Sequence, residues 1–303
     1  MEKQSYQLVP VSGKPKLTMR YYKAKQPQKG IIVFVHGVSH GAWCWEDFVG
    51  FFTKEHYACF AVNLRGHGDN KRFFKGTLGQ YVKDVGRCMV ECKRYCKSKG
   101  ISYSAPFILG HSMGGAIVEK YISKNSDHVR GAVLFAPVTA KGMGTDVVKT
   151  SVSKSGRCTI KTVIGFKNNK HLDISNFFVA KTGKKLIPRI TDQEKLSYYN
   201  SKFCRESLPT MCQLIKFRLQ IPDIPVFVIG TDTDAYFNAD SLNATASFYG
   251  TKAMIIEGLC HDMMLDPRRK EPAQAVLEFL SRPDKLKKSP FEFIEDLERK
   301  VNI

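Results

Sequence analysis

The chain has 303 residues, a length that suits one large α/β domain with an insertion or two small domains. Hydrophobic residues make up 43% and charged residues 25%, values that exclude wholesale disorder. Residues 1–16 contain no apolar core, so no signal peptide is expected, and no apolar run approaches the length of a membrane span. The sequence therefore predicts a soluble, cytoplasmic protein with no integral membrane segment.

The net charge is +19, and residues 139–220 alone hold 16 Lys or Arg against 5 Asp or Glu. Such an excess can attract nucleic acid, acidic lipid headgroups or anionic substrates. No nucleic-acid-binding motif accompanies it, so we interpret the charge as a solvated surface and do not expect nucleic acid as a partner.

The nine cysteines are odd in number, which favours free thiols. Cys88, Cys92 and Cys96 recur every four residues, so a helix would align them on one stripe. No nearby histidine joins them and the spacing is not Cys-x-x-Cys. The stripe therefore indicates a buried helix face made of small residues, and no metal site is expected.

Buried strands and helices are predicted to alternate along the chain. Leu17, Met19 and Tyr21 alternate near the start and could add an antiparallel strand at one edge. The apolar runs that predict buried strands are residues 31–36, 59–64, 106–110, 131–136, 225–230 and 253–257. The segments with helical character are about 43–54, 78–98, 113–124, 238–248 and 270–281. This order predicts an α/β fold with a mostly parallel, doubly wound sheet covered on both faces.

One interval breaks this rhythm, because the stretch between 131–136 and 225–230 is far longer than an ordinary crossover. We predict a helical cap or lid insertion at 139–220 that lies over one end of the sheet. Residues 1–138 and 221–303 would then form the core. The stretch 291–301 has an amphipathic helical pattern and is expected to pack on the domain surface.

Residues 107–115, FILGHSMGG, contain the pattern Gly-x-Ser-x-Gly. The bare pattern arises by chance in about one such chain in ten, but here a buried strand runs into Gly110 and a helical pattern follows at once. So tight a strand-to-helix turn strains the serine backbone and lifts its hydroxyl above the sheet edge. We therefore predict that Ser112 is a nucleophile; a serine in an ordinary tight turn is the alternative.

A serine hydroxyl needs a base to take its proton. In this architecture the serine, the acid and the histidine follow one another in that order. Of the eight histidines, only His261 follows the last predicted strand, at the edge of the sheet where sites of open α/β folds lie. His261 is the predicted base, with a structural histidine as the alternative.

Two backbone N–H groups are needed to hold the oxyanion. One is predicted at Met113, directly after the nucleophile and at a helix N-terminus that favours negative charge. The other is predicted at Val38, just after the first strong strand ends in His36 and Gly37. His36 itself is expected to shape this loop rather than to act in catalysis.

Four blocks in order, VHGVSHGAWCW (35–45), NLRGHG (63–68), GHSMGG (110–115) and GLCHDMMLD (258–266), resemble the α/β-hydrolase superfamily. The first is especially similar to the plant methylesterase and hydroxynitrile lyase group and to bacterial lysophospholipase-like or carboxylesterase-like proteins. The resemblance implies a Ser–His–Asp serine hydrolase with no metal and no organic cofactor. Asn63 stands where relatives often have aspartate, a departure expected to matter for local structure and not for chemistry.

The same resemblance directs the choice of the acid. Relatives often place it nine positions after the proline that begins the penultimate strand, which from Pro225 is Asp234. A count from Gly230 ends on Thr233 instead, so the register leaves room for Asp232. Asp234 is the predicted acid, and Asp232 remains the alternative, with a possible role in the turn backbone.

These residues predict hydrolysis of a carboxylic ester, a thioester or a lysophospholipid through an acyl-enzyme. Anionic or lipid-like substrates are a subordinate hypothesis suggested by the basic insertion. Two alternatives stay open: a hydroxynitrile lyase-like or other non-hydrolytic reaction on the same triad, and a ligand-binding protein or receptor with slow turnover. The lyase alternative is weakened because those relatives carry threonine in place of Gly37 and lysine in place of Asp262.

Overall fold

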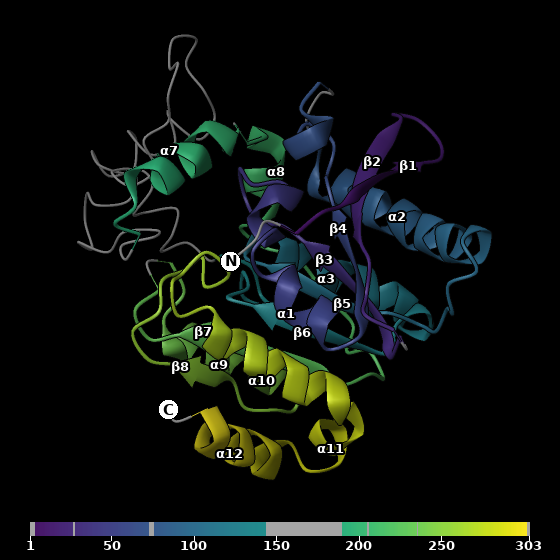
Figure 1. Cartoon of the computed structure of the whole chain (residues 1–303). Helices are drawn as coiled ribbons and strands as arrows, with labels where there is room; N and C mark the ends of the chain where they lie inside the picture. Colours follow the sequence, from purple (N-terminus) through teal and green to yellow (C-terminus); the bar gives the residue numbers. More distant parts are fainter. Residues whose placement is uncertain are drawn as a thin grey trace, which may run out of the picture.

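The computed structural model describes residues 4–26, 28–72, 76–143, 190–204, 206–234 and 236–301. Within them, eight strands form a single sheet in the order β1-β2-β4-β3-β5-β6-β7-β8 (Figure 1). The strands are β1 Gln7–Val11, β2 Leu17–Tyr22, β3 Gly30–Val35, β4 Tyr57–Val62, β5 Phe107–His111, β6 Gly131–Phe135, β7 Val226–Thr231 and β8 Met254–Ile256. Strands β1 and β2 run antiparallel to their neighbours, and all pairings from β4 to β8 are parallel.

Helices cover both faces of the sheet (Figure 1). The α-helices are α1 Val49–Lys54, α2 Leu78–Ser98, α3 Met113–Asn125, α7 Gln193–Lys202, α8 Leu208–Gln213, α9 Ala239–Phe248, α10 Lys270–Ser281, α11 Pro283–Lys288 and α12 Pro290–Val301. Short 3-10 helices are η1 Ala42–Trp45, η2 Gly68–Asn70 and η3 Ser126–His128. The predicted doubly wound α/β sheet is confirmed.

The core consists of two apolar layers, one on each face of the sheet. Successive residues of a strand point to opposite faces, so Val33 of β3 packs in the layer that holds α2, α3 and α9, while Phe34 packs in the layer that holds α1, α10 and α12. The cysteine stripe of α2 lies in the first layer: Cys88, Cys92 and Cys96 are buried and free of disulfides, as expected. Cys158 lies outside the described residues.

Three local expectations are corrected. Strand β1 was not predicted, because three of its five residues are exposed and an edge strand of this kind carries little apolar signal. Residues 43–54 do not form one helix but the 3-10 turn η1 followed by α1, because all four residues of η1 are buried and no amphipathic face is left to solvent. The strand predicted at 59–64 begins earlier, at Tyr57.

Part of the predicted insertion is described, namely residues 190–204 and 206–220, called the cap segment below. Its helices α7 and α8 lie in the upper part of Figure 1, to the left of β1 and β2. Tyr199 of α7 stacks on Trp43, at 5.8 Å between ring centroids, and Phe203 packs against the same ring at 5.0 Å. Residues 144–189 lie outside the described residues, so the division into core and cap stays a prediction.

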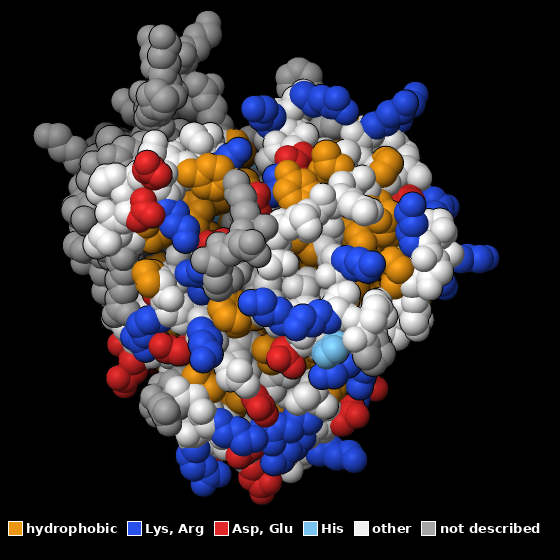
Figure 2. Space-filling model, viewed as in Figure 1, with side chains coloured by type: hydrophobic (Ala, Val, Ile, Leu, Met, Phe, Trp, Pro, Cys, Tyr) orange, Lys and Arg blue, Asp and Glu red, His pale blue; other side chains and the backbone are white. Residues whose placement is uncertain are grey.

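Basic side chains are spread over the face shown in Figure 2 rather than gathered in one patch. Near the C-terminal helices they alternate with acids and form ion pairs, such as Arg282 with Asp296 at 2.6 Å and Arg282 with Glu278 at 3.0 Å. This distribution agrees with a solvated surface. Among the helices that the structure describes, none is long and apolar enough to cross a membrane.

Candidate active site

Ser112 lies between β5 and α3, at the carboxyl edge of the sheet. Its φ of 53° and ψ of −117° are values that a residue with a side chain adopts only under constraint. The turn is tight: a Cβ atom at Gly110 would lie 2.3 Å from the Gly114 carbonyl oxygen, and one at Gly114 would lie 2.4 Å from the Val35 carbonyl oxygen. The two glycines therefore allow the close approach of helix and strands that the sequence pattern indicated.

Asp234 and His261 form a buried hydrogen-bonded pair in the loops after β7 and β8. His261 Nδ1 lies 2.7 Å from Asp234 Oδ2. The other oxygen, Oδ1, accepts the backbone N–H groups of Tyr236 at 2.6 Å and Phe237 at 3.1 Å. A carboxylate held in this way fixes the orientation and the tautomer of the imidazole and leaves Nε2 for a reacting group.

Asp232, the other acid of this loop, is exposed and has different partners. Its Oδ1 accepts the Gly258 N–H at 2.6 Å and the Thr231 hydroxyl at 3.2 Å. Thr231 Oγ1 also accepts the Leu259 N–H and lies near the Leu259 carbonyl oxygen, both at 3.1 Å. Asp232 thus shapes the loop that carries the histidine, and Asp234 is the acid that the structure brings to its ring.

The surroundings of His261 favour its protonated form. Burial lowers the pKa of His261, but the charge and hydrogen bond of Asp234 and the charge of Asp262 outweigh burial, so the pKa lies above its ordinary value. The rings of Tyr236 and Phe237 pack on the imidazole, at 4.8 and 5.8 Å between centroids. Such a ring can accept a proton readily and hold it until a leaving group takes it.

Ser112 is not hydrogen-bonded to His261, but the residue before it packs on the His261 ring. The neighbouring residue, His111, has its ring centroid 4.8 Å from that of His261 and its Nε2 3.2 Å from the His261 carbonyl oxygen. No hydrogen bond between Ser112 Oγ and His261 Nε2 occurs within the described parts of the chain. In enzymes without substrate this contact is often long and tightens on binding.

The loop after β3, residues 36–41, runs against the serine and is called the oxyanion loop below. A Cβ atom at Gly37 would lie 3.1 Å from Ser112 Cβ and 2.8 Å from His111 Nδ1. Val38 follows Gly37, and Met113 begins α3 directly after the serine. The two predicted N–H donors therefore belong to the residue after Gly37 and the residue after Ser112.

His36 has the structural role that its position indicated. Its Nδ1 lies 2.9 Å from the Gly37 carbonyl oxygen, and its Nε2 accepts the Leu64 N–H at 3.3 Å. Burial, with the nearby His67, lowers the pKa of His36 well below its ordinary value. The neutral ring thus joins the oxyanion loop to the loop after β4.

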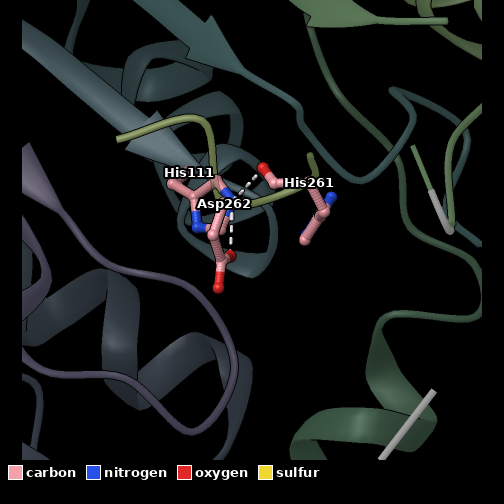
Figure 3. Close-up of side chains that lie close together, drawn as sticks. All are labelled: His111, His261 and Asp262. Atoms are coloured by element: carbon pink, nitrogen blue, oxygen red, sulfur yellow. Dashed lines mark hydrogen bonds and ion pairs between the residues drawn. The ribbon is translucent and has the colours of Figure 1, made fainter. Parts of the chain in front are cut away.

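Asp262 is the feature of the site that the sequence did not assign a role. Its side chain is fully buried, 3.2 Å from His40 Nε2 and 3.4 Å from His111 Nε2. Figure 3 shows His111 facing both Asp262 and the His261 carbonyl oxygen. The signals that could have found this cluster are the second histidine of VHGVSHG and the His-Asp pair after the last strand, since both segments end at one edge of the sheet.

Within the described residues, His111, His261 and Asp262 are the group whose ligand atoms lie close enough together, within 4.8 Å, to hold a metal ion. His261 uses Nδ1 to bond Asp234, and His111 Nε2 faces the His261 carbonyl oxygen at 3.2 Å (Figure 3). The three residues therefore fit a hydrogen-bonded cluster better than a metal centre.

The cap segment reaches the oxyanion loop through Glu206, which is 3% exposed. Its Oε2 lies 2.9 Å from His67 Nε2 and accepts the Ser39 N–H at 3.3 Å. Its Oε1 accepts the Tyr81 hydroxyl at 2.9 Å. Ser39 directly follows Val38, so this carboxylate helps to fix the position of the predicted oxyanion donor.

Asn63, the departure from the family pattern, has a local structural role. Its Oδ1 accepts the Ala42 N–H at 2.8 Å, and its Nδ2 donates to Asp69 Oδ2 at 2.9 Å. Asp69 also pairs with Arg20 Nε at 2.7 Å. An aspartate at 63 would remove the amide donor and place two carboxylates together, so the asparagine fits this arrangement.

Comparison with known proteins gives a family and a fold. Residues 26–268 match the family described as serine aminopeptidase, S33. A probable lysophospholipase L2 from Haemophilus influenzae is 22% identical over 295 residues, covering 89% of this chain and 91% of that protein. The human monoglyceride lipase is 24% identical over 171 residues, covering 53% of this chain and 55% of that protein.

Among solved structures, a thermostable carboxyl esterase from Bacillus coagulans superposes with a TM-score of 0.67 at 15% identity, covering 91% of this chain and 98% of that one. A monoacylglycerol lipase from Paleococcus ferrophilus gives a TM-score of 0.63 at 17% identity, with coverage of 87% and 98%. These similarities show that this chain has the same fold as the two solved structures.

Proposed function

Because the chain belongs to the serine aminopeptidase S33 family of α/β-hydrolases, we propose that it is a serine hydrolase that cleaves carboxylic esters through Ser112, His261 and Asp234. The observation that carries the proposal is the 2.7 Å hydrogen bond between Asp234 and His261, beside a serine held at positive φ in a strand-to-helix turn. Activated serines in this fold have the same three parts.

In the first half of the reaction, His261 Nε2 takes the proton of Ser112, and the serine oxygen attacks the ester carbonyl. The N–H groups of Val38 and Met113 hold the oxyanion; loss of one such donor costs about 3 kcal/mol in related chemistry. Asp234 keeps the imidazole in the required tautomer and stabilises its charged form. The imidazolium then gives its proton to the departing alcohol.

In the second half, water attacks the acyl-enzyme with His261 again as base, and the acid product leaves. No metal and no organic cofactor is needed for either half. Relatives named as a lysophospholipase and a monoglyceride lipase support esters with an acyl chain as the substrate class. Thioesters and lysophospholipids can follow the same route.

Two other functions are less well supported. A hydroxynitrile lyase would carry threonine at position 37, but here a Cβ atom at Gly37 would meet His111 Nδ1 at 2.8 Å. It would also carry lysine at position 262, where the structure has a buried carboxylate between two histidines. A receptor with slow turnover gains no specific support from these contacts.

The decisive experiment is labelling with a fluorophosphonate probe, comparing the native protein with Ser112→Ala. We expect labelling of the native protein and none of the variant, with turnover of a nitrophenyl ester reduced by about a millionfold. An unlabelled native protein would overturn the proposal. Product analysis with ester and cyanohydrin substrates separates hydrolysis from lyase chemistry.

The subordinate hypothesis of anionic substrates has its own test. Esters of equal chain length, one neutral and one anionic, are compared at low and at high salt. A basic surface near the site would give the anionic ester a higher kcat/KM at low salt, and added salt would remove the advantage. Equal rates at low salt would contradict it.

A further inference from the structure

We propose that Asp262 is a positioning residue that braces three loops of the site at once: its own loop with His261, the oxyanion loop through His40, and the serine turn through His111. The proposal rests on the proposed function, since it assigns a part in the same reaction. It goes beyond the three predicted catalytic side chains, because Asp262 acts on them through its neighbours.

The burial of Asp262 is the first step of the argument. Its side chain has no exposed surface, and a carboxylate in such a place is costly unless it is paired and hydrogen-bonded. The two partners come from two other segments: His40 Nε2 is hydrogen-bonded to Oδ2 at 3.2 Å, and His111 Nε2, at the end of β5, lies 3.4 Å from Oδ1, which has no hydrogen-bond partner among the described residues. A single carboxylate therefore joins segments that are far apart in the sequence.

The second step concerns His40, which is bonded at both ring nitrogens. Its Nδ1 lies 2.6 Å from the Val38 carbonyl oxygen, and its Nε2 faces Asp262. The ring therefore lies between two acceptors, one from the backbone of its own loop and one from a distant side chain. The ring thus connects Asp262 by a charge-assisted hydrogen bond to the residue whose N–H is proposed to hold the oxyanion.

The third step concerns His111, the residue before the serine. Burial, together with the charge of His261, lowers the pKa of His111 well below its ordinary value, so the ring is neutral. Its one proton belongs on Nε2, which faces the His261 carbonyl at 3.2 Å as well as Asp262. Nδ1 is buried against Gly37 and has no hydrogen-bond partner among the described residues.

Several ionisable groups face Asp262 from the elements packed around it. They are His40 of the oxyanion loop, Cys44 of η1, His111 of β5, Tyr236 after β7, and Cys260 and His261 of its own loop. Burial raises the pKa of both thiols and of the phenol, so these three stay neutral when the histidines titrate. The negative charge of Asp262 therefore acts mainly on imidazoles, and it raises the pKa of His261.

The test compares Asp262→Asn with Asp232→Asn, a matched control that also removes a carboxylate bonded within this pair of loops. In Asp262→Asn, fluorophosphonate labelling and kcat should fall about 100-fold, the size of effect that a small misplacement of reacting groups produces, with little change in KM. The acid limb of the kcat/KM profile should move to lower pH, because loss of the negative charge lowers the pKa of His261. Asp232→Asn should leave that limb in place.

Loosening of the fold alone would not move the acid limb. The proposal is overturned if Asp262→Asn labels within about threefold of the native rate, or if its acid limb stays where the native one lies.

If Asp262→Asn does not fold, His40→Gln decides. A glutamine amide can still donate toward Asp262 but cannot also reach the Val38 carbonyl, so labelling should fall at least about tenfold; a rate within about threefold of native would overturn the brace. Ser112→Ala and the native protein are run in parallel. If the native protein is neither labelled nor active, both the proposed function and the positioning role of Asp262 are contradicted. If the native protein is active and Asp262→Asn is unaffected, only the positioning role of Asp262 is contradicted.

Discussion

His261 and Asp262 are neighbours in one loop, yet each belongs to a different buried His–Asp pair. In the first pair, His261 gives Nδ1 to Asp234, and no hydrogen bond to its Nε2 occurs among the described residues. In the second, His40 gives Nε2 to Asp262 and Nδ1 to the Val38 carbonyl. The second ring is held at both ends. A His–Asp pair can thus act as a base when one ring nitrogen has no hydrogen-bond partner. It holds loops together when both ring nitrogens are hydrogen-bonded.

A third buried pair follows the pattern of the brace. His67 Nδ1 lies 2.9 Å from the Arg65 carbonyl oxygen, and its Nε2 lies 2.9 Å from Glu206. The histidine in each brace bonds the carbonyl two residues before it, and the acid comes from a distant segment. The two braces meet at the oxyanion loop, one from the His261 loop and one from the cap segment.

The largest expected effect comes from breaking the open pair. Asp234→Asn should lower kcat by about 10⁴-fold, because the amide favours the wrong tautomer of His261 while the geometry survives. Steady-state kinetics and a thermal melt measure this. Asp232→Asn is the control and should stay within about threefold of native, since that side chain bonds only the loop. A large loss in the control with little loss in Asp234→Asn would reverse the assignment of the acid.

Breaking the third pair should have a smaller effect on rate and a clear effect on stability. Glu206→Gln weakens the bonds to His67 and Ser39, so the free energy of unfolding should fall by about 2 kcal/mol and kcat by about tenfold. Urea unfolding and steady-state kinetics measure the two. Glu194→Gln, an exposed acid of the same cap segment, should change neither. Equal stability of the two variants would show that Glu206 is no brace.

The sequence was sufficient for most of the sheet, because buried parallel strands are continuous apolar runs that stand out in any reading. It was weakest where burial is one-sided or irregular, as in β1 and in the break between η1 and α1. In the site, the glycines around Ser112 and the position of His261 were readable because they follow from a local turn and a chain order.

The positioning roles of Asp262 and Glu206 could not be predicted from the sequence in this way. Asp262 and Glu206 depend on which loops meet across the sheet edge, and a residue type alone does not reveal its distant partner. The choice between Asp232 and Asp234 had the same difficulty. The two acids are two positions apart in one loop, yet one carboxylate bonds a turn N–H and the other bonds an imidazole. Only the loop geometry separates the two acids.

The smallest expected effect is on the pH dependence of the native protein. This dependence measures how Asp234 and Asp262 together act on His261. His261 must be neutral to accept the serine proton, so activity falls as pH drops through its pKa. Because Asp234 and Asp262 together outweigh burial, the midpoint of the acid limb of kcat/KM for a neutral ester should lie above 6.5.

Salt distinguishes the source of that shift. Both carboxylates are buried beside the ring and are screened little, whereas the positive surface charge acts from a distance and is screened strongly. The midpoint should therefore stay above 6.5 when profiles are measured at low and at high ionic strength. A midpoint below 6.5 at both would mean that burial, and not the paired acids, controls His261, and Asp262 would then hold its loops without tuning the base.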